Sequence, residues 1–171
     1  MIGPLEAVTL CLGYPGPGSL EALESAVDRL PAGSARSGIE AFLAEVSQLD
    51  LGQWEELHTE TLDLSPRFVP YVGHVVWGES YRRGAFMADL QRAQIEVGVD
   101  QRGELPDHLV PVLGYLAAVE EPLEELADVL PQALAAMRRE LKRSDADNPY
   151  RHVLEAAAAA ADARLGEGAA A

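Results

Sequence analysis

Cysteine and long hydrophobic runs are nearly absent from this chain. The single cysteine, Cys11, excludes an intramolecular disulfide and a thiolate metal cluster, and its apolar neighbours favour a buried small hydrophobe over a reactive thiol. No apolar run reaches the ~20 residues that span a bilayer. The start of the chain lacks the charged region and the cleavage site of a secretion signal. We therefore expect a cytoplasmic protein that does not insert into the membrane.

Basic residues are also scarce. The 171 residues include 13 Lys and Arg against 28 Asp and Glu, which gives a formal net charge of −15. A surface of this charge repels phosphate backbones and anionic lipid, so we expect no nucleic-acid partner. It attracts a cationic partner, mainly by raising the rate of encounter. The alternative is that the acidity only keeps the protein soluble.

Aromatic residues are few, at 6%, and Ala and Leu dominate the 48% of apolar residues. This composition favours helices over sheets, and the length fits one domain. Internal repeats and alternation of period two are both missing from the sequence. We predict an all-α, single-domain bundle of eight or nine helices over residues 1–164, followed by a disordered tail at 165–171.

Apolar residues recur at spacings of three and four, the period of a helix with one apolar face. Pro131 falls within the longest such segment and is expected to kink or divide it. The nearly apolar segment 107–119 is predicted to lie at the centre of the fold, because a helix that is apolar on all sides is surrounded by others. The segments with the helical period are 20–30, 39–46, 86–90 and 123–141.

Two dipeptides predict helix starts. Ser65-Pro66 and Asn148-Pro149 each place a capping residue before a proline, which is favoured at the first helical position. The segment 13–18 contains alternating glycines and prolines and is predicted to be a rigid loop.

Motifs for catalysis or metal binding are missing from the sequence. The four histidines have no metal-ligand spacing, and there is no phosphate-binding glycine loop and no serine nucleophile elbow. Paired carboxylates such as Glu55 and Glu56 lie on polar helix faces and are interpreted as solvated surface. We expect no enzyme, no metal and no cofactor. The function must then be carried by a surface that binds a partner.

Two motifs in the middle third of the chain carry the strongest signal. The first begins with LDLSPR at residues 62–67, passes through His74, and continues with WGES at 77–80 and RRG at 82–84. The second is ELPDHL at 104–109, followed by an apolar run to Ala117. In this order and spacing, and with LGYP at 12–15, they resemble the NarJ family of nitrate reductase assembly chaperones, within the wider TorD/DmsD group.

The resemblance implies an all-helical chaperone without catalysis of its own. Such proteins bind the N-terminal segment, a twin-arginine leader or its remnant, of an immature molybdoenzyme subunit. They keep that subunit competent for molybdenum-cofactor insertion and prevent premature membrane attachment. The expected partner is the apo catalytic α subunit of respiratory nitrate reductase, in nitrate assimilation. The alternatives are a sister chaperone for another molybdoenzyme, a structural subunit, or a small helical enzyme.

The resemblance also implies a leader site that includes Pro106, Asp107 and His108. Helix-in-groove recognition suits a basic amphipathic segment, with apolar anchors in the groove and acidic residues at its rim. The candidate partner-binding residues are Asp63, Tyr71, His74, Trp77, Gly78, Arg83, Gly84, Pro106, Asp107, His108 and Leu113.

Several of these residues have a structural alternative. Asp107 can accept a hydrogen bond from a leader arginine, but capping of the following helix is the favoured interpretation. His108 can gate that contact near neutral pH or bond within the core. For Arg83 we favour an internal ion pair, with Asp63 or Glu79 as partner.

The remaining candidates are weighed in the same way. Trp77 is either an anchor for the partner or a core residue, and packing is favoured for Tyr71, His74 and Leu113. Gly78 and Gly84 permit close backbone approach or end a helix. The chain departs from the family at two positions, with Val110 where a proline is usual and Gly114 where an acidic residue is usual, which leaves the shape of the site open.

Overall fold

The computed structural model describes residues 2–170, and within that range the chain forms nine α-helices and no β-strand. The predicted all-α bundle of eight or nine helices is confirmed. The helices are α1 (Pro4–Leu12), α2 (Ser19–Arg29), α3 (Ser34–Val46), α4 (Leu51–His58), α5 (Val72–Trp77), α6 (Tyr81–Glu96), α7 (Leu109–Ala118), α8 (Glu124–Ser144) and α9 (Tyr150–Ala170), and a π-helical turn, Thr59–Asp63, follows α4.

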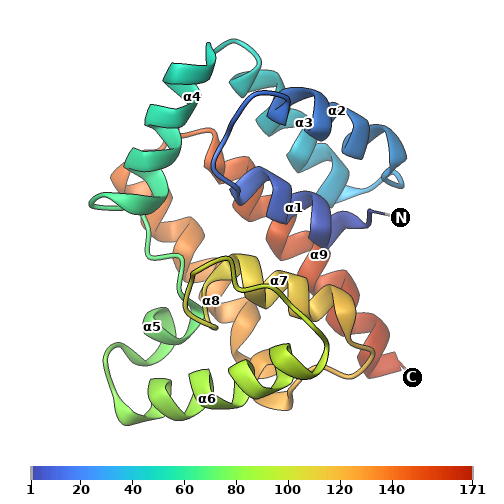
Figure 1. The fold of residues 1–171 in the computed structure, drawn as a ribbon, viewed down its shortest axis with the longest axis vertical. Helices are drawn as coiled ribbons and strands as arrows, with labels where there is room; N and C mark the ends of the chain where they lie inside the picture. Colours follow the sequence, from blue (N-terminus) through green and yellow to red (C-terminus); the bar gives the residue numbers. More distant parts are fainter. Residues whose placement is uncertain (1, 171) are drawn as a thin grey trace.

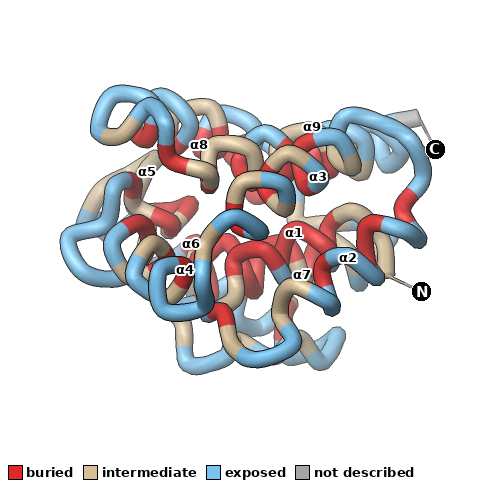
Figure 2. Tube along the Cα trace, turned by 90° about the horizontal axis from the view of Figure 1, so that it is seen from above, coloured by how far each residue is buried: buried red, intermediate tan, exposed pale blue. Residues whose placement is uncertain are grey.

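The centre of the bundle is formed by α1 and α7 together with the long helix α9 (Figure 1). All residues of 109–113 in α7 are buried, as expected from their apolar character. α1 packs on both α7 and α9, and Figure 2 shows its buried residues in the interior. Cys11 of α1 is fully buried, which confirms the predicted buried hydrophobe, and burial raises its thiol pKa to about 12.

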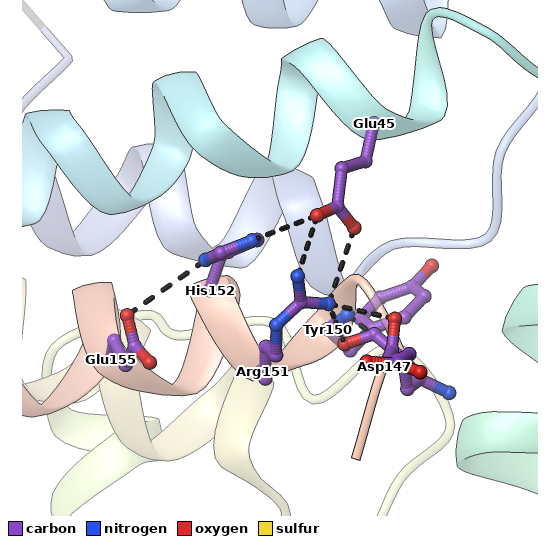
Figure 3. Close-up of polar contacts among 7 residues, drawn as sticks. Glu45, Asp147, Tyr150, Arg151, His152 and Glu155 are labelled. Carbon is purple, nitrogen blue, oxygen red and sulfur yellow. Dashed lines mark hydrogen bonds and ion pairs between the residues drawn. The ribbon is translucent and has the colours of Figure 1, made fainter. Parts of the chain in front are cut away.

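α3 lies along α9 at close range. Gly38 makes this approach possible, because a Cβ at that position would lie 2.9 Å from the carbonyl oxygen of His152. The two helices are also joined at their surface by Glu45 of α3, which accepts hydrogen bonds from Arg151 and His152 of α9 (Figure 3). Small residues and one ion-pair cluster therefore fix this pair of helices.

Acidification is expected to weaken the α3–α9 contact. Burial raises the pKa of Glu45, but the hydrogen bonds and charges of Arg151 and His152 outweigh it and lower the pKa below its usual 4.5. The contribution to stability is therefore complete above pH 4.5 and lost as the pH falls through the lower pKa of the folded state. The Tm difference between the wild type and Glu45→Gln should narrow between about pH 6 and pH 3. The control Glu21→Gln, exposed on α2, should show no narrowing.

One predicted helix start is wrong. Ser65-Pro66 begins no helix, because the π-helical turn leads into Ser65 with a φ of +50° and the chain continues irregularly to α5. Of the two outcomes expected at Pro131, a kink or a division of the long helix, the division does not occur, since α8 continues through Pro131. Pro131 is exposed, so water can bond the carbonyl that its missing N–H leaves without a partner. The other predicted start is confirmed, because Asn148 Oδ1 accepts the backbone N–H of Tyr150 at 2.9 Å.

The predicted domain boundary at residue 164 does not coincide with the end of a helix. α9 continues through 165–170, which the sequence assigned to a disordered tail. Arg164 donates a hydrogen bond to the carbonyl of Val119, and Leu165 packs against the core. These contacts hold the last turns of an alanine-rich segment with high helix propensity. Ala171 lies outside the described residues.

Candidate functional site

The two sequence motifs meet through their backbones. The N–H of Val72 donates to the carbonyl of Asp107 at 2.8 Å, and the N–H of Leu109 donates to the carbonyl of Pro70 at 2.9 Å. Tyr71 and His108 thereby form an isolated antiparallel bridge. This short pairing places the entrance of α5 beside the entrance of α7.

The carboxylate of Asp107 is at the centre of this junction and is fully buried. It receives Nε of Arg83 at 3.0 Å and Nη2 of Arg83 at 3.3 Å, and the N–H of Gly73 donates to it at 3.1 Å. A buried carboxylate is costly without such partners. We call Gly73, Arg83 and Asp107 the junction cluster, and it ties α5 and α6 to the start of α7.

The predicted capping role of Asp107 is wrong. The N-cap of α7 is His108, whose Nδ1 accepts the N–H of Val110 at 3.1 Å. The favoured internal ion pair of Arg83 is confirmed, but its partner is Asp107 and not Asp63 or Glu79. The guanidinium of this chain therefore occupies the position at which a leader arginine was expected to bind.

Gly73 was missed by the sequence analysis. A Cβ at this position would lie 2.8 Å from Oδ2 of Asp107, 3.0 Å from Cγ of Arg83 and 3.2 Å from Cδ2 of Phe86. All three neighbours are held in the interior, so only glycine lets the backbone approach the carboxylate this closely. The sequence signal was a glycine between two motif residues, and nothing local distinguished it from a loop glycine.

Tyr71 and His108 cover the junction cluster. The rings lie edge to face with 5.1 Å between centroids, and the Tyr71 hydroxyl donates to Glu104 at 2.7 Å. Burial and the hydrogen bond to Glu104 raise the pKa of Tyr71 to about 12. Burial lowers the pKa of His108, although the carboxylates of Glu104, Asp107 and Asp63 oppose this. A neutral His108 that caps a helix does not support the predicted gate near neutral pH.

Trp77 is half-buried at the end of α5 and was predicted to be either an anchor or a core residue. One edge of its ring contacts Phe86, with 5.0 Å between centroids, and the Arg82 guanidinium lies 5.3 Å from its ring centroid. Gly78 follows with a φ of +65°, and its N–H donates to the carbonyl of His74 at 2.8 Å. Gly78 thus ends α5, one of the two roles expected for it.

The other candidate residues are dispersed. Asp63 is exposed at the end of the π-helical turn, and His74 is half-buried on α5. Gly84 is exposed on α6 with open space around it, so it permits no close approach. Leu113 is fully buried in α7, in agreement with packing. Pro106 is buried, and its carbonyl accepts Nε2 of Gln94 at 2.8 Å, a buried contact that the sequence analysis missed.

The third motif, at 12–15, lies against a different histidine. Tyr14 is largely exposed and packs edge to face on His58, whose Nε2 bonds the Leu12 carbonyl at 3.0 Å. The His58 ring, at the end of α4, also lies edge to face with Tyr150 of α9. The structure therefore joins the two central motifs directly and leaves the third beside another part of the core.

A groove opens on the surface next to the junction cluster. It has a volume of about 440 Å³ and lies between the end of α5, the start of α6 and the first half of α8. Arg82 crosses it and donates to Glu125 at 3.3 Å. We call it the α5–α8 groove, and its lining residues are Val76, Trp77, Arg82, Glu124, Glu125, Asp128, Val129 and Gln132.

The groove combines an apolar wall with carboxylates. Trp77, Val76 and Val129 supply the apolar surface, whereas three acidic side chains of α8 border it. The single cation among these lining residues, Arg82, has 61% of its side chain exposed, and its guanidinium pairs with Glu125. This arrangement suits a basic segment with apolar side chains.

Within residues 2–170, no three His, Cys, Asp or Glu side chains are grouped so that they could hold a metal ion. None of the helices described there has the length and apolar character needed to cross a membrane. Comparison with known proteins finds no family model that matches the chain and no curated protein that is similar to it.

Proposed function

We propose that this protein is an assembly chaperone of the NarJ type. It binds the basic N-terminal segment of the apo catalytic α subunit of nitrate reductase in the cytoplasm. That binding keeps the subunit competent for molybdenum-cofactor insertion before membrane attachment. The proposal takes the identity of the partner from the resemblance of the two central motifs and the place of binding from the α5–α8 groove.

The observation that carries the proposal is the position of Arg82 in this groove. Its guanidinium lies over the Trp77 ring and bonds a carboxylate of α8 at the same time. A cation over an aromatic face contributes about 0.5–1 kcal/mol at an exposed site. The groove therefore has the contacts that an arginine of a leader segment needs, and a leader arginine would displace the exposed side chain of Arg82 from them.

The junction cluster fixes the two helices, α5 and α6, that line one side of the groove. Arg83 is anchored on Asp107, while the neighbouring Arg82, at the preceding position of α6, has an exposed side chain. Gly73, at the start of α5, is held by the same carboxylate, and Trp77 ends that helix one turn later. The motif residues thus act mainly by fixing the position of Trp77 against α8, and the predicted direct contact between Asp107 and a leader arginine is replaced by this indirect role.

The net charge supports the same partner. A chain with a formal charge of −15 attracts a basic segment over distances of about 8 Å at physiological salt. Three carboxylates at the groove can then bind the basic side chains of that segment directly. The rate of association should therefore fall as the salt concentration rises, while the apolar contact with Trp77 should persist.

Calorimetry with a synthetic peptide of the first ~15 residues of the nitrate reductase α subunit, about 22 Å long as a helix, tests the proposal. We expect micromolar or tighter binding with a negative heat-capacity change, because apolar surface is buried. Trp77→Ala should weaken the affinity by about tenfold or more, as for an aromatic anchor. Glu125→Gln should weaken it less, by about two- to fivefold, since exposed ion pairs contribute little.

Glu140→Gln is the matched control, because it removes a carboxylate from the same helix outside the groove. Equal losses for Glu125→Gln and Glu140→Gln would mean that only overall charge matters. Leaders of other molybdoenzymes, titrated in the same way, separate the nitrate reductase partner from that of a sister chaperone. Absence of binding to every leader would overturn the proposal.

A further inference from the structure

Four of the 13 basic residues of this acidic chain lie together, three of them on the half of α8 that is remote from the α5–α8 groove and one on α9. A second groove of about 480 Å³ lies there between α8 and α9. Four basic side chains and one carboxylate border it, and Glu45 pairs with one of the four, Arg151, which leaves an excess of two positive charges. We call it the α8–α9 groove, and it is lined by Ala135, Arg138, Arg139, Lys142, Arg151 and Glu155, with Ala146 at its end.

Arg151 is held in a fixed position at this groove (Figure 3). Its Nη2 donates to Glu45 at 2.6 Å, and its Nη1 donates to the carbonyls of Asp147 and Asn148 at 2.7 and 3.0 Å. Within residues 2–170 its Nε–H has no acceptor, and about a third of the side chain is exposed. An immobilised cation loses little conformational entropy when a ligand binds, so it is a favourable contact for an anion.

The cations of α8 lack this kind of internal partner. Arg138, Arg139 and Lys142 form no ion pair and no side-chain hydrogen bond with residues 2–170, unlike the exposed Arg36, which pairs with a carboxylate on its own helix. Arg138 and Lys142 are four residues apart, a spacing at which like charges on a helix repel each other.

The helix dipole explains only part of this cluster. Cations in the last turn of a helix are stabilised by the dipole, which accounts for Lys142 near the end of α8. Arg138 and Arg139 lie more than one turn before that end, where the effect has faded. The dipole therefore does not explain their concentration at one groove, in a chain with 13 basic residues.

We infer that the α8–α9 groove binds a small phosphorylated molecule. The planar guanidinium groups of Arg138 and Arg139 suit the oxygens of a phosphate, and Arg151 adds a fixed third cation. Ala135 and the aliphatic stem of Lys142 supply apolar surface for the rest of the ligand. An adjoining hollow of about 660 Å³ shares Arg138 and Glu155, which leaves room for a ligand larger than phosphate itself.

The short range of electrostatic attraction in salt favours a small ligand over a polyanion. Screening limits the field of exposed charges to about 8 Å at physiological salt, so a dianion in the groove senses mainly the local cations. A duplex or an anionic membrane extends well beyond that distance and meets the repulsion of a chain with a net charge of −15. The volume of the groove is also within the range of small-molecule sites, about 300–1,000 Å³.

Phosphorus NMR titrations of the full chain with pyrophosphate, and with inorganic phosphate, at about 0.15 M sodium chloride test this inference. We expect saturable binding of pyrophosphate with a Kd of about 1 mM or tighter. Arg138→Gln combined with Arg139→Gln should weaken it by tenfold or more, since charge-assisted bonds to phosphate are lost. Both residues are exposed, so the Tm should change little.

Arg29→Gln combined with Arg67→Gln is the control, because it changes the net charge equally at exposed positions outside the groove. This pair should leave the affinity within about twofold. Absence of saturable binding, or equal losses in the two double variants, would overturn the inference. Tighter binding of a hexaglutamate peptide or a DNA duplex at the same arginines would also overturn it, in favour of a macromolecular partner.

Discussion

Asp107→Ala is expected to lower the free energy of unfolding by about 3–5 kcal/mol, the usual cost of breaking a buried ion pair from one side. The substitution leaves the guanidinium of Arg83 in the interior without its counter-charge, and it leaves the N–H of Gly73 without an acceptor. In a domain of this length that loss corresponds to a drop in Tm of roughly 10 °C. Urea unfolding at about pH 7, followed by circular dichroism, measures it.

A double-mutant cycle separates the ion pair from other effects of the substitution. Arg83→Met removes the cation and should also destabilise the protein, but the two substitutions together should cost less than the sum, with an interaction energy of about 1–3 kcal/mol. Arg82→Met is the control, because its exposed ion pair should contribute no more than about 1 kcal/mol. A cost near 1 kcal/mol for Asp107→Ala, typical of a lost helix cap, together with strict additivity, would contradict the buried pair.

The same variant distinguishes a supporting role from direct contact with the leader. Because Asp107 is fully buried, its loss should reduce leader affinity mainly by loosening α5 and α6. Trp77→Ala should show the reverse, with a large loss of affinity and a smaller loss of Tm, since the tryptophan is only half-buried. If Asp107→Ala abolished binding while the Tm stayed unchanged, the carboxylate would have to reach the leader itself.

Four of the helices predicted from sequence have an apolar stripe along one face. α2, α3, α6 and α8 all combine such a stripe with an exposed opposite face, so their period is legible without structural information. The short helix α5 was not predicted. It has six residues, three of them valines and one a glycine, so its local propensity is low and its contacts with α6 and α8 stabilise it.

The candidate site was predicted less completely, because its geometry depends on contacts between distant residues. The sequence placed Asp107 before an apolar helix, where a capping role is the reasonable local interpretation. In the structure the carboxylate instead binds the guanidinium of Arg83, which lies 24 residues earlier in the sequence. The importance of Gly73 depends on the same packing, and so does the meeting of Trp77 with the acidic residues of α8, which are over 40 residues away in sequence.

Gly73 and Gly84, two glycines of the first motif region, should respond oppositely to substitution by alanine. Gly73→Ala is expected to destabilise the protein by about 3 kcal/mol, near the upper end of the usual cost of overpacking. Its Cβ would lie 2.8 Å from the buried carboxylate of Asp107, and the packed side chains of Arg83 and Phe86 leave no free space beside it. α5 would have to move away from α6, and the Trp77 wall of the α5–α8 groove would move with it.

Gly84→Ala is the matched control for that prediction. Gly84 lies within α6, is exposed, and has no atom within 4 Å of the position of an added Cβ apart from its chain neighbours and the backbone of its own helix. Alanine should therefore stabilise the helix by about 0.5–1 kcal/mol, the difference in helix propensity. Urea unfolding of both variants measures the two signs, and the leader titration should show a loss for Gly73→Ala alone. If both alanines stabilised the protein equally, the close approach of α5 to Asp107 would be refuted, and with it the support that places Trp77 at the groove.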